Sequence, residues 1–179
     1  MFKHEKVIWL TRTAVLIALT VALQAATRPL MSTYITGTVI NLMLIISVMS
    51  CGFFTGVTVA AVSPVMATLV GVPGPTWIFI PFIAAGNIVL ISAWYFIGNR
   101  AIINQYVSYL IALIIGAITK FLILHFGIVW LLMGIRTFNI VALMANPLSV
   151  PQLITASAGG VCAIILLPPL MKGIKQRKP

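Results

Sequence analysis

Long apolar runs of this sequence contain three polar residues, either near their ends or inside them: Asn41, Asn87 and Lys120. If those runs cross a membrane, each polar group must find a hydrogen-bond partner, because lipid tails offer none. Two amides and one ammonium group can hold a polar or anionic molecule by hydrogen bonds. They lack the carboxylate, histidine or cysteine partner that acid–base or nucleophilic catalysis uses. The set therefore indicates a binding site.

Further polar and aromatic residues gather at the same ends of these runs. They are Tyr34, Trp77, Arg136, Asn139, Gln152 and Thr155. Because the opposite halves of the runs carry few polar atoms, we expect a polar pocket that opens outward. Structural roles remain open for each residue alone. The segment TGTVIN (36–41) also fits a helix N-cap at Thr36 or Thr38, and single amides or aromatics can serve helix packing or the interface.

Lys120 raises the sharpest question, because an ammonium group in lipid normally has a carboxylate partner. Glu5 is the only acidic residue of the chain, and it lies near the N-terminus. Three alternatives are open. Lys120 could snorkel outward, sit neutral among carbonyls and amides such as Asn87, or await an anion from a ligand. The third alternative favours a ligand with a carboxylate, and Arg136 would reinforce the attraction of such a ligand.

The elements that must position these residues are transmembrane helices. Hydrophobic residues make up 61% of the 179 residues and charged residues 7%, against about 25% charged in soluble domains. The sequence predicts an all-α membrane protein with one domain, 1–179. Six helices are expected, at residues 7–26, 39–51, 54–70, 77–97, 106–126 and 151–171. The boundary near Gly52 is weak, so the second and third helices could form one broken segment.

The positions of the basic residues predict the topology. Lysines and arginines are concentrated before residue 13 and after residue 171, and Arg100 falls on the same side of a six-span arrangement. Only Arg28 and Arg136 fall on the other side. By the positive-inside rule both termini are cytoplasmic. The net charge of +10 reflects this topology and contact with the lipid bilayer, and it does not indicate nucleic-acid binding.

Several segments, taken in order, resemble a known family. They are LIALTVALQ, TGTVINLMLI, SPVMATLVG, GNIVL, KFLIL and PQLITASAGGVCA. Together with the size and the six helices, they are similar to the substrate-binding S components of energy-coupling factor (ECF) vitamin transporters. The resemblance implies a bacterial cell-membrane protein that captures a water-soluble vitamin outside the cell. It also implies association with a coupling membrane subunit and two ATPase subunits, on which the S component topples to deliver its ligand.

The resemblance further implies a docking face on the first helix, because the family uses small residues there to contact the coupling subunit. Ala14, Ala18, Ala22 and Ala26 follow each other at four-residue spacing. Such a stripe lets helix backbones approach closely in lipid. Packing within the protein's own bundle is the alternative.

Other function classes fit the residues less well. The chain shows no catalytic set and no metal or cofactor motif, so we do not expect an enzyme. An ion-coupled carrier would use an intramembrane Asp or Glu, and a structural subunit would need no polar pocket. The vitamin itself is not specified by the sequence. A carboxylate such as pantothenate and a neutral ring such as hydroxymethylpyrimidine both remain open.

Overall fold

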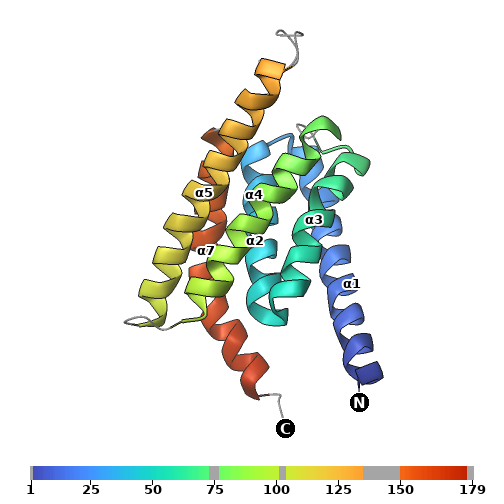
Figure 1. Ribbon diagram of the computed structural model, residues 1–179. Coiled ribbons are helices and arrows are strands. Elements are labelled where there is room, and N and C mark those ends of the chain that lie inside the picture. Colours follow the sequence, from blue (N-terminus) through green and yellow to red (C-terminus); the bar gives the residue numbers. More distant parts are fainter. Residues whose placement is uncertain (1, 73–76, 101–103, 135–149, 177–179) are drawn as a thin grey trace.

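The computed structural model describes residues 2–72, 77–100, 104–134 and 150–176, and these ranges form a bundle of helices (Figure 1). Its long helices are α1 (Phe2–Thr27), α2 (Thr33–Cys51), α3 (Phe53–Leu69), α4 (Ile80–Ala93), α5 (Gln105–Gly134) and α7 (Val150–Gln176). A 3-10 turn, Trp77–Phe79, leads into α4, and a π-helical segment, Trp94–Gly98, continues it. The start of α1 and the end of α7 lie at the same end of the bundle, which we call the terminal end (Figure 1).

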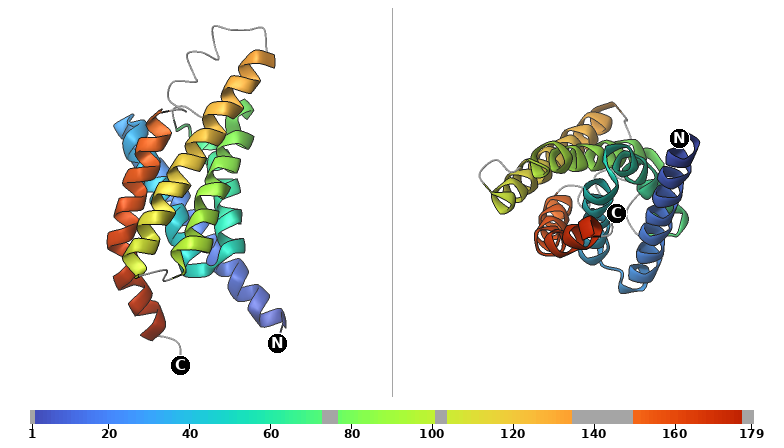
Figure 2. Two further views of the ribbon diagram at one scale, coloured as in Figure 1. Left: turned by 60° about the vertical axis from the view of Figure 1, so that its left-hand side comes forward. Right: turned by 90° about the horizontal axis from the view of Figure 1, so that it is seen from below.

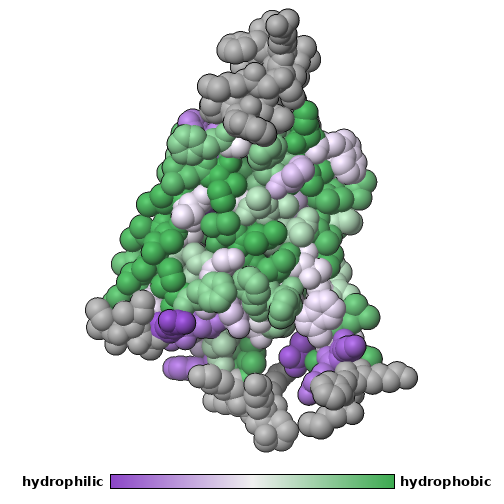
Figure 3. All heavy atoms as spheres, viewed as in Figure 1, coloured by the Kyte–Doolittle hydropathy of each residue, from purple (hydrophilic) through white to green (hydrophobic). Residues whose placement is uncertain are grey.

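The helices have the length and composition of membrane spans. Five apolar stretches are long enough to cross a bilayer: Glu5–Leu30, Thr33–Cys51, Trp77–Gly98, Gln105–Gly127 and Val150–Ile174. The remaining long helix, α3, lies where a span was predicted but has only 17 residues. Hydrophobic residues dominate the visible surface, and hydrophilic ones gather toward the terminal end (Figure 3). The chain is therefore an all-α, multi-pass membrane protein.

The structure corrects the predicted start of the second helix. α2 begins at Thr33, six residues before residue 39, and its N-cap is Ser32, whose hydroxyl accepts a hydrogen bond from the Ile35 N–H at 3.4 Å. Thr36 and Thr38 therefore do not cap the helix. They lie inside it, together with Gly37, because Ser32 already supplies the acceptor that the free backbone N–H groups need.

The other helices differ from the prediction mainly at their ends. α1 begins five residues earlier than predicted, α5 continues eight residues beyond residue 126, and α7 continues five beyond residue 171. The apolar sequence after residue 126 offers no breaker, since a glycine such as Gly127 costs a helix only about 1 kcal/mol. Pro168 and Pro169 both lie inside α7.

A single glycine separates α2 from α3, which settles the weak boundary between them. Gly52 has φ 92° and ψ 174°, a conformation open essentially to glycine alone. The chain reverses there, so α2 and α3 form an antiparallel hairpin and not one broken segment (Figure 1). Gly56 permits close packing just after the turn, because a Cβ atom there would lie 2.6 Å from the Cβ of Val48.

The six long helices of the described chain pack in the cyclic order α1, α2, α7, α5, α4, α3 (Figure 2). Their shared core contains Leu44, Ile45, Leu90, Trp94 and Leu167, all of them fully buried. α1 faces this bundle with polar side chains. Thr13 donates to the Thr55 hydroxyl at 3.3 Å, and the Gln24 amide donates to the carbonyl and hydroxyl of Ser63 at 3.2 and 3.1 Å.

The tight contact between α2 and α7 makes a prediction possible. A Cβ atom on Gly159 would lie 2.9 Å from the Thr38 carbonyl oxygen and 3.0 Å from the Leu42 nitrogen, both of them backbone atoms. We expect Gly159→Ala to lower the free energy of unfolding by about 1–3 kcal/mol through overpacking. Gly173→Ala is the matched control, because nothing lies within 4 Å of that Cβ position on the same helix. Unfolding of both purified variants in mixed micelles measures the difference, and equal stabilities would contradict the close approach.

Candidate functional site

The ammonium group of Lys120 lies inside the bundle, where two amide oxygens hold it. Its Nζ donates to Oδ1 of Asn41 at 2.6 Å and to Oδ1 of Asn87 at 2.8 Å. The three residues come from α5, α2 and α4, and each has no more than 2% of its surface exposed. Because the side chain turns inward, Lys120 does not snorkel in this structure.

A second layer of hydrogen bonds continues outward from the two amides. Asn41 Nδ2 donates to the Thr155 hydroxyl at 3.2 Å, and that hydroxyl donates to the Gln152 carbonyl oxygen at 3.2 Å. Asn87 Nδ2 lies 3.5 Å from the Ala60 carbonyl oxygen. Both amide oxygens face the ammonium group, so every hydrogen bond in the network runs away from Lys120. We call Asn41, Asn87, Lys120 and Thr155 the lysine cluster.

The lysine cluster lies nearer the end of the bundle opposite the termini. Asn41 is eight residues into α2, which starts at that end, or about 12 Å along it. Lys120 is fifteen residues into α5, which starts at the terminal end, or about 22 Å along it (Figure 2). Since the two helices run in opposite directions, these depths bring the side chains to the same level. The aliphatic part of Lys120 passes Gly86, where a Cβ atom would lie 3.3 Å from the Lys120 Cγ.

When Lys120 is protonated, the cluster holds a cation without an anion among the described residues. An ammonium group has three N–H donors, and two of them have acceptors among the described residues. Within that part of the chain both acceptors are neutral amide oxygens, and the only carboxylate of the sequence, Glu5, lies on the first turn of α1. The third N–H group of a protonated Lys120 is therefore left without an acceptor among the described residues, and a negatively charged acceptor would gain the most from it.

The structure brings together four of the nine residues predicted for the ligand site. Gln152 adds only its backbone carbonyl group. Tyr34 and Trp77 are 51% and 61% exposed, so they lie on the surface and not in the lysine cluster. Arg136 and Asn139 lie outside the described residues.

Sequence reasoning missed the small groups that make the cluster possible. The Ala60 carbonyl receives the Asn87 amide, and Gly37 of α2 lies against Thr155, because a Cβ atom there would be 2.8 Å from its methyl group. Because Gly86 has no side chain, the aliphatic part of Lys120 can pack against it. A usable signal was present, since Gly86 directly precedes Asn87 and Gly37 lies one helical turn before Asn41.

The alanines at positions 14, 18, 22 and 26 are all exposed on α1. They point away from the bundle, while the polar residues Thr13, Thr20 and Gln24 of the same helix are buried against it. The stripe thus does not pack within the protein's own bundle in this structure. Its role in docking a coupling subunit stays a prediction.

Comparisons with known proteins found no relative of this chain. Comparison with family models, with curated proteins and with solved structures gives no match for this chain. Among the residues that the structure describes, no three His, Cys, Asp or Glu side chains are grouped closely enough to hold a metal ion. The hypothesis about function must therefore stand on the lysine cluster and on the arrangement of the helices around it.

Proposed function

We propose that this protein is the vitamin-binding S component of an ECF-type importer in a bacterial cell membrane. In this proposal it captures a small water-soluble vitamin from outside and hands it over by toppling on a coupling membrane subunit that is driven by two ATPase subunits. It acts as a binding protein and not as an enzyme. One observation carries the proposal: a fully buried lysine whose ammonium group is held by two asparagine amides and by no carboxylate of the described chain.

The lysine cluster supports a ligand with a carboxylate, of which pantothenate is an example. Burying a cation without a counter-ion is costly, and a ligand anion would remove that cost at the moment of binding. Charge-assisted hydrogen bonds contribute about 1.5–3 kcal/mol each. Asn41 and Asn87 already orient the ammonium group, so little further ordering is needed when the anion arrives.

The proposed orientation places the terminal end of the bundle in the cytoplasm and counts α3 as a sixth span. Basic residues of the described chain lie at that end, among them Lys6, Arg12 and Lys172. Under the positive-inside rule this end stays in the cytoplasm. The lysine cluster then lies in the outer half of the membrane, within reach of a ligand that arrives from outside.

Two alternatives are compatible with the lysine cluster. A neutral ring such as hydroxymethylpyrimidine would use the amide groups of Asn41 and Asn87 and would gain nothing from the charge. A structural membrane subunit without transport would be consistent with the way the cluster satisfies most of its own hydrogen-bonding groups.

A ligand screen on the isolated protein tests the proposal. We expect the full chain, purified in detergent and without ATP, to be stabilised by one vitamin that carries a carboxylate. A ligand at a hundred times its Kd stabilises the folded state by about 2.7 kcal/mol. Pantothenate, nicotinate and biotin form the anionic arm, and pyridoxine and hydroxymethylpyrimidine form the neutral arm. Stabilisation by a neutral compound alone would refute the counter-ion role, and no stabilisation by any vitamin would favour the structural subunit.

A further inference from the structure

A cavity of about 300 Å³ lies at the terminal end of the bundle, far along α1 from the level of the lysine cluster. It is formed by the first turns of α1 and by the turn between α2 and α3. Its lining residues are Glu5, Ile8, Trp9, Arg12, Cys51 and Thr55. The cavity thus combines the only acidic residue of the 179 with an arginine and with a tryptophan that is 41% exposed.

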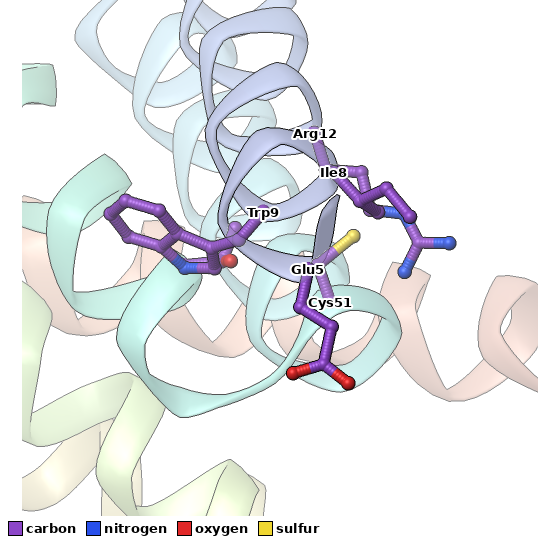
Figure 4. A pocket seen from close by; sticks show the side chains of 6 residues that line it. Glu5, Ile8, Trp9, Arg12 and Cys51 are labelled. Carbon is purple, nitrogen blue, oxygen red and sulfur yellow. The ribbon is translucent and has the colours of Figure 1, made fainter. Parts of the chain in front are cut away.

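The two charged side chains of this cavity are not paired with each other. Glu5 and Arg12 both leave α1 on the side of Cys51, and their charged ends diverge, the carboxylate one way and the guanidinium group another (Figure 4). Neither charged end has a hydrogen bond or an ion pair within the described part of the chain. One positive and one negative group therefore stand apart at the edge of this open cavity, and neither has a partner among the described residues.

We propose that this cavity binds the headgroup of a phospholipid that carries both a phosphodiester and a primary amine, the phosphoethanolamine class. Arg12 donates to the phosphate oxygens, as a planar guanidinium group does well. Glu5 accepts hydrogen bonds from the ammonium group. Trp9 lies at the level where aromatic residues favour the membrane interface. The acyl chains of the lipid continue along the exposed apolar face of α1, which includes Val15 and Leu19.

The position of Glu5 distinguishes this lipid class from an anionic one. The rest of the terminal end is basic, which attracts anionic lipids in general. A carboxylate at the cavity repels a second negative charge, and it attracts the primary amine that phosphatidylethanolamine carries and phosphatidylglycerol lacks. The single acidic residue of this basic sequence therefore lines the same cavity as an arginine. This assignment does not depend on the transport proposal.

Lipid retention by the full chain tests the inference. The protein is placed in nanodiscs made of equal amounts of phosphatidylethanolamine and phosphatidylglycerol with the same acyl chains, then released and examined by native mass spectrometry. We expect the wild type to retain phosphatidylethanolamine about fivefold over phosphatidylglycerol, a modest factor because the charges are partly exposed. Glu5→Gln should remove the preference, and Arg12→Gln should lower retention of both lipids. Arg100→Gln, an exposed arginine at the same end but outside the cavity, should change neither.

Each other outcome overturns the inference. A wild type that retains phosphatidylglycerol preferentially shows an ordinary basic surface. An unchanged preference in Glu5→Gln removes the carboxylate from the recognition. A second experiment adds soluble glycerophosphoethanolamine. If an equal concentration of this compound displaces the lipid, the ligand of the cavity is a soluble molecule and not a lipid. If a variant fails to fold, the relative retention of the two lipids by the wild type alone tests the inference.

Discussion

Replacing Lys120 by methionine is expected to weaken the binding of an anionic vitamin by roughly ten- to a hundredfold, while the protein remains folded. Methionine keeps much of the length of the lysine stem beside Gly86 but removes the ammonium group. The lost charge-assisted interaction corresponds to about 1.5–3 kcal/mol, or roughly one to two decades in Kd. The oxygens of Asn41 and Asn87 lose their donor, at about 1–3 kcal/mol each. Removal of an uncompensated buried charge offsets part of that cost.

Titration calorimetry with the vitamin that the wild type binds measures the effect. Lys172→Met is the matched control, because this exposed lysine lies on α7 at the terminal end. The Lys172→Met variant should bind the vitamin with the affinity of the wild type. Stability of both variants is measured without ligand, so that a folding defect is not mistaken for a binding defect. Undiminished affinity of Lys120→Met would show that the lysine cluster is structural.

Tryptophan at Ala18 or Ala22 is expected to abolish assembly with a coupling subunit and leave vitamin binding unchanged. Both alanines are exposed on α1 and point away from the bundle, so a large side chain there meets no atom of the protein's own core. A helix partner that packs on a small-residue stripe approaches closely, and an indole ring would hold it off by several ångströms. Co-purification of the coupling subunit and the ATPases measures assembly.

Ala85→Trp provides the control for this prediction. Ala85 is an exposed alanine on α4, so the substitution adds the same bulk to a lipid-facing helix away from the stripe. We expect that variant to assemble normally. If the Ala18 and Ala22 variants also assemble normally, the docking face lies elsewhere, although the vitamin-binding proposal stands.

Among the described residues, the positions and order of the long helices were predictable, because apolar runs are separated by polar, Gly or Pro signals. The exact ends of the helices were less predictable. Ser32 caps α2 well before the apolar run begins, and the threonines after it are polar residues that a helix simply contains. The reversal at Gly52 depends on one backbone conformation, which a pattern of hydrophobicity does not reveal.

The lysine cluster was predictable as a set but not as a geometry. The rule that polar groups in lipid must be satisfied singles out Asn41, Asn87 and Lys120. Which amide oxygen faces the ammonium group depends on the rotation of α2 and α4, which the packing of glycines sets. Gln24 was missed for the same reason, since only the structure shows that α1 turns its polar side toward Ser63.

The one-residue turn at Gly52 has a consequence for the surrounding bilayer. α2 and α3 contain 19 and 17 residues, or about 28 and 26 Å of helix, and the tight turn leaves no room for either to add a turn there. α1 and α7 contain 26 and 27 residues, or about 40 Å each. A hydrocarbon core of about 30 Å therefore exceeds the length of α3, and if α3 crosses the membrane, the bilayer beside it is expected to thin. Such mismatch costs fractions of a kcal/mol per ångström, so we expect the acyl-chain length of the membrane to affect the stability of this protein.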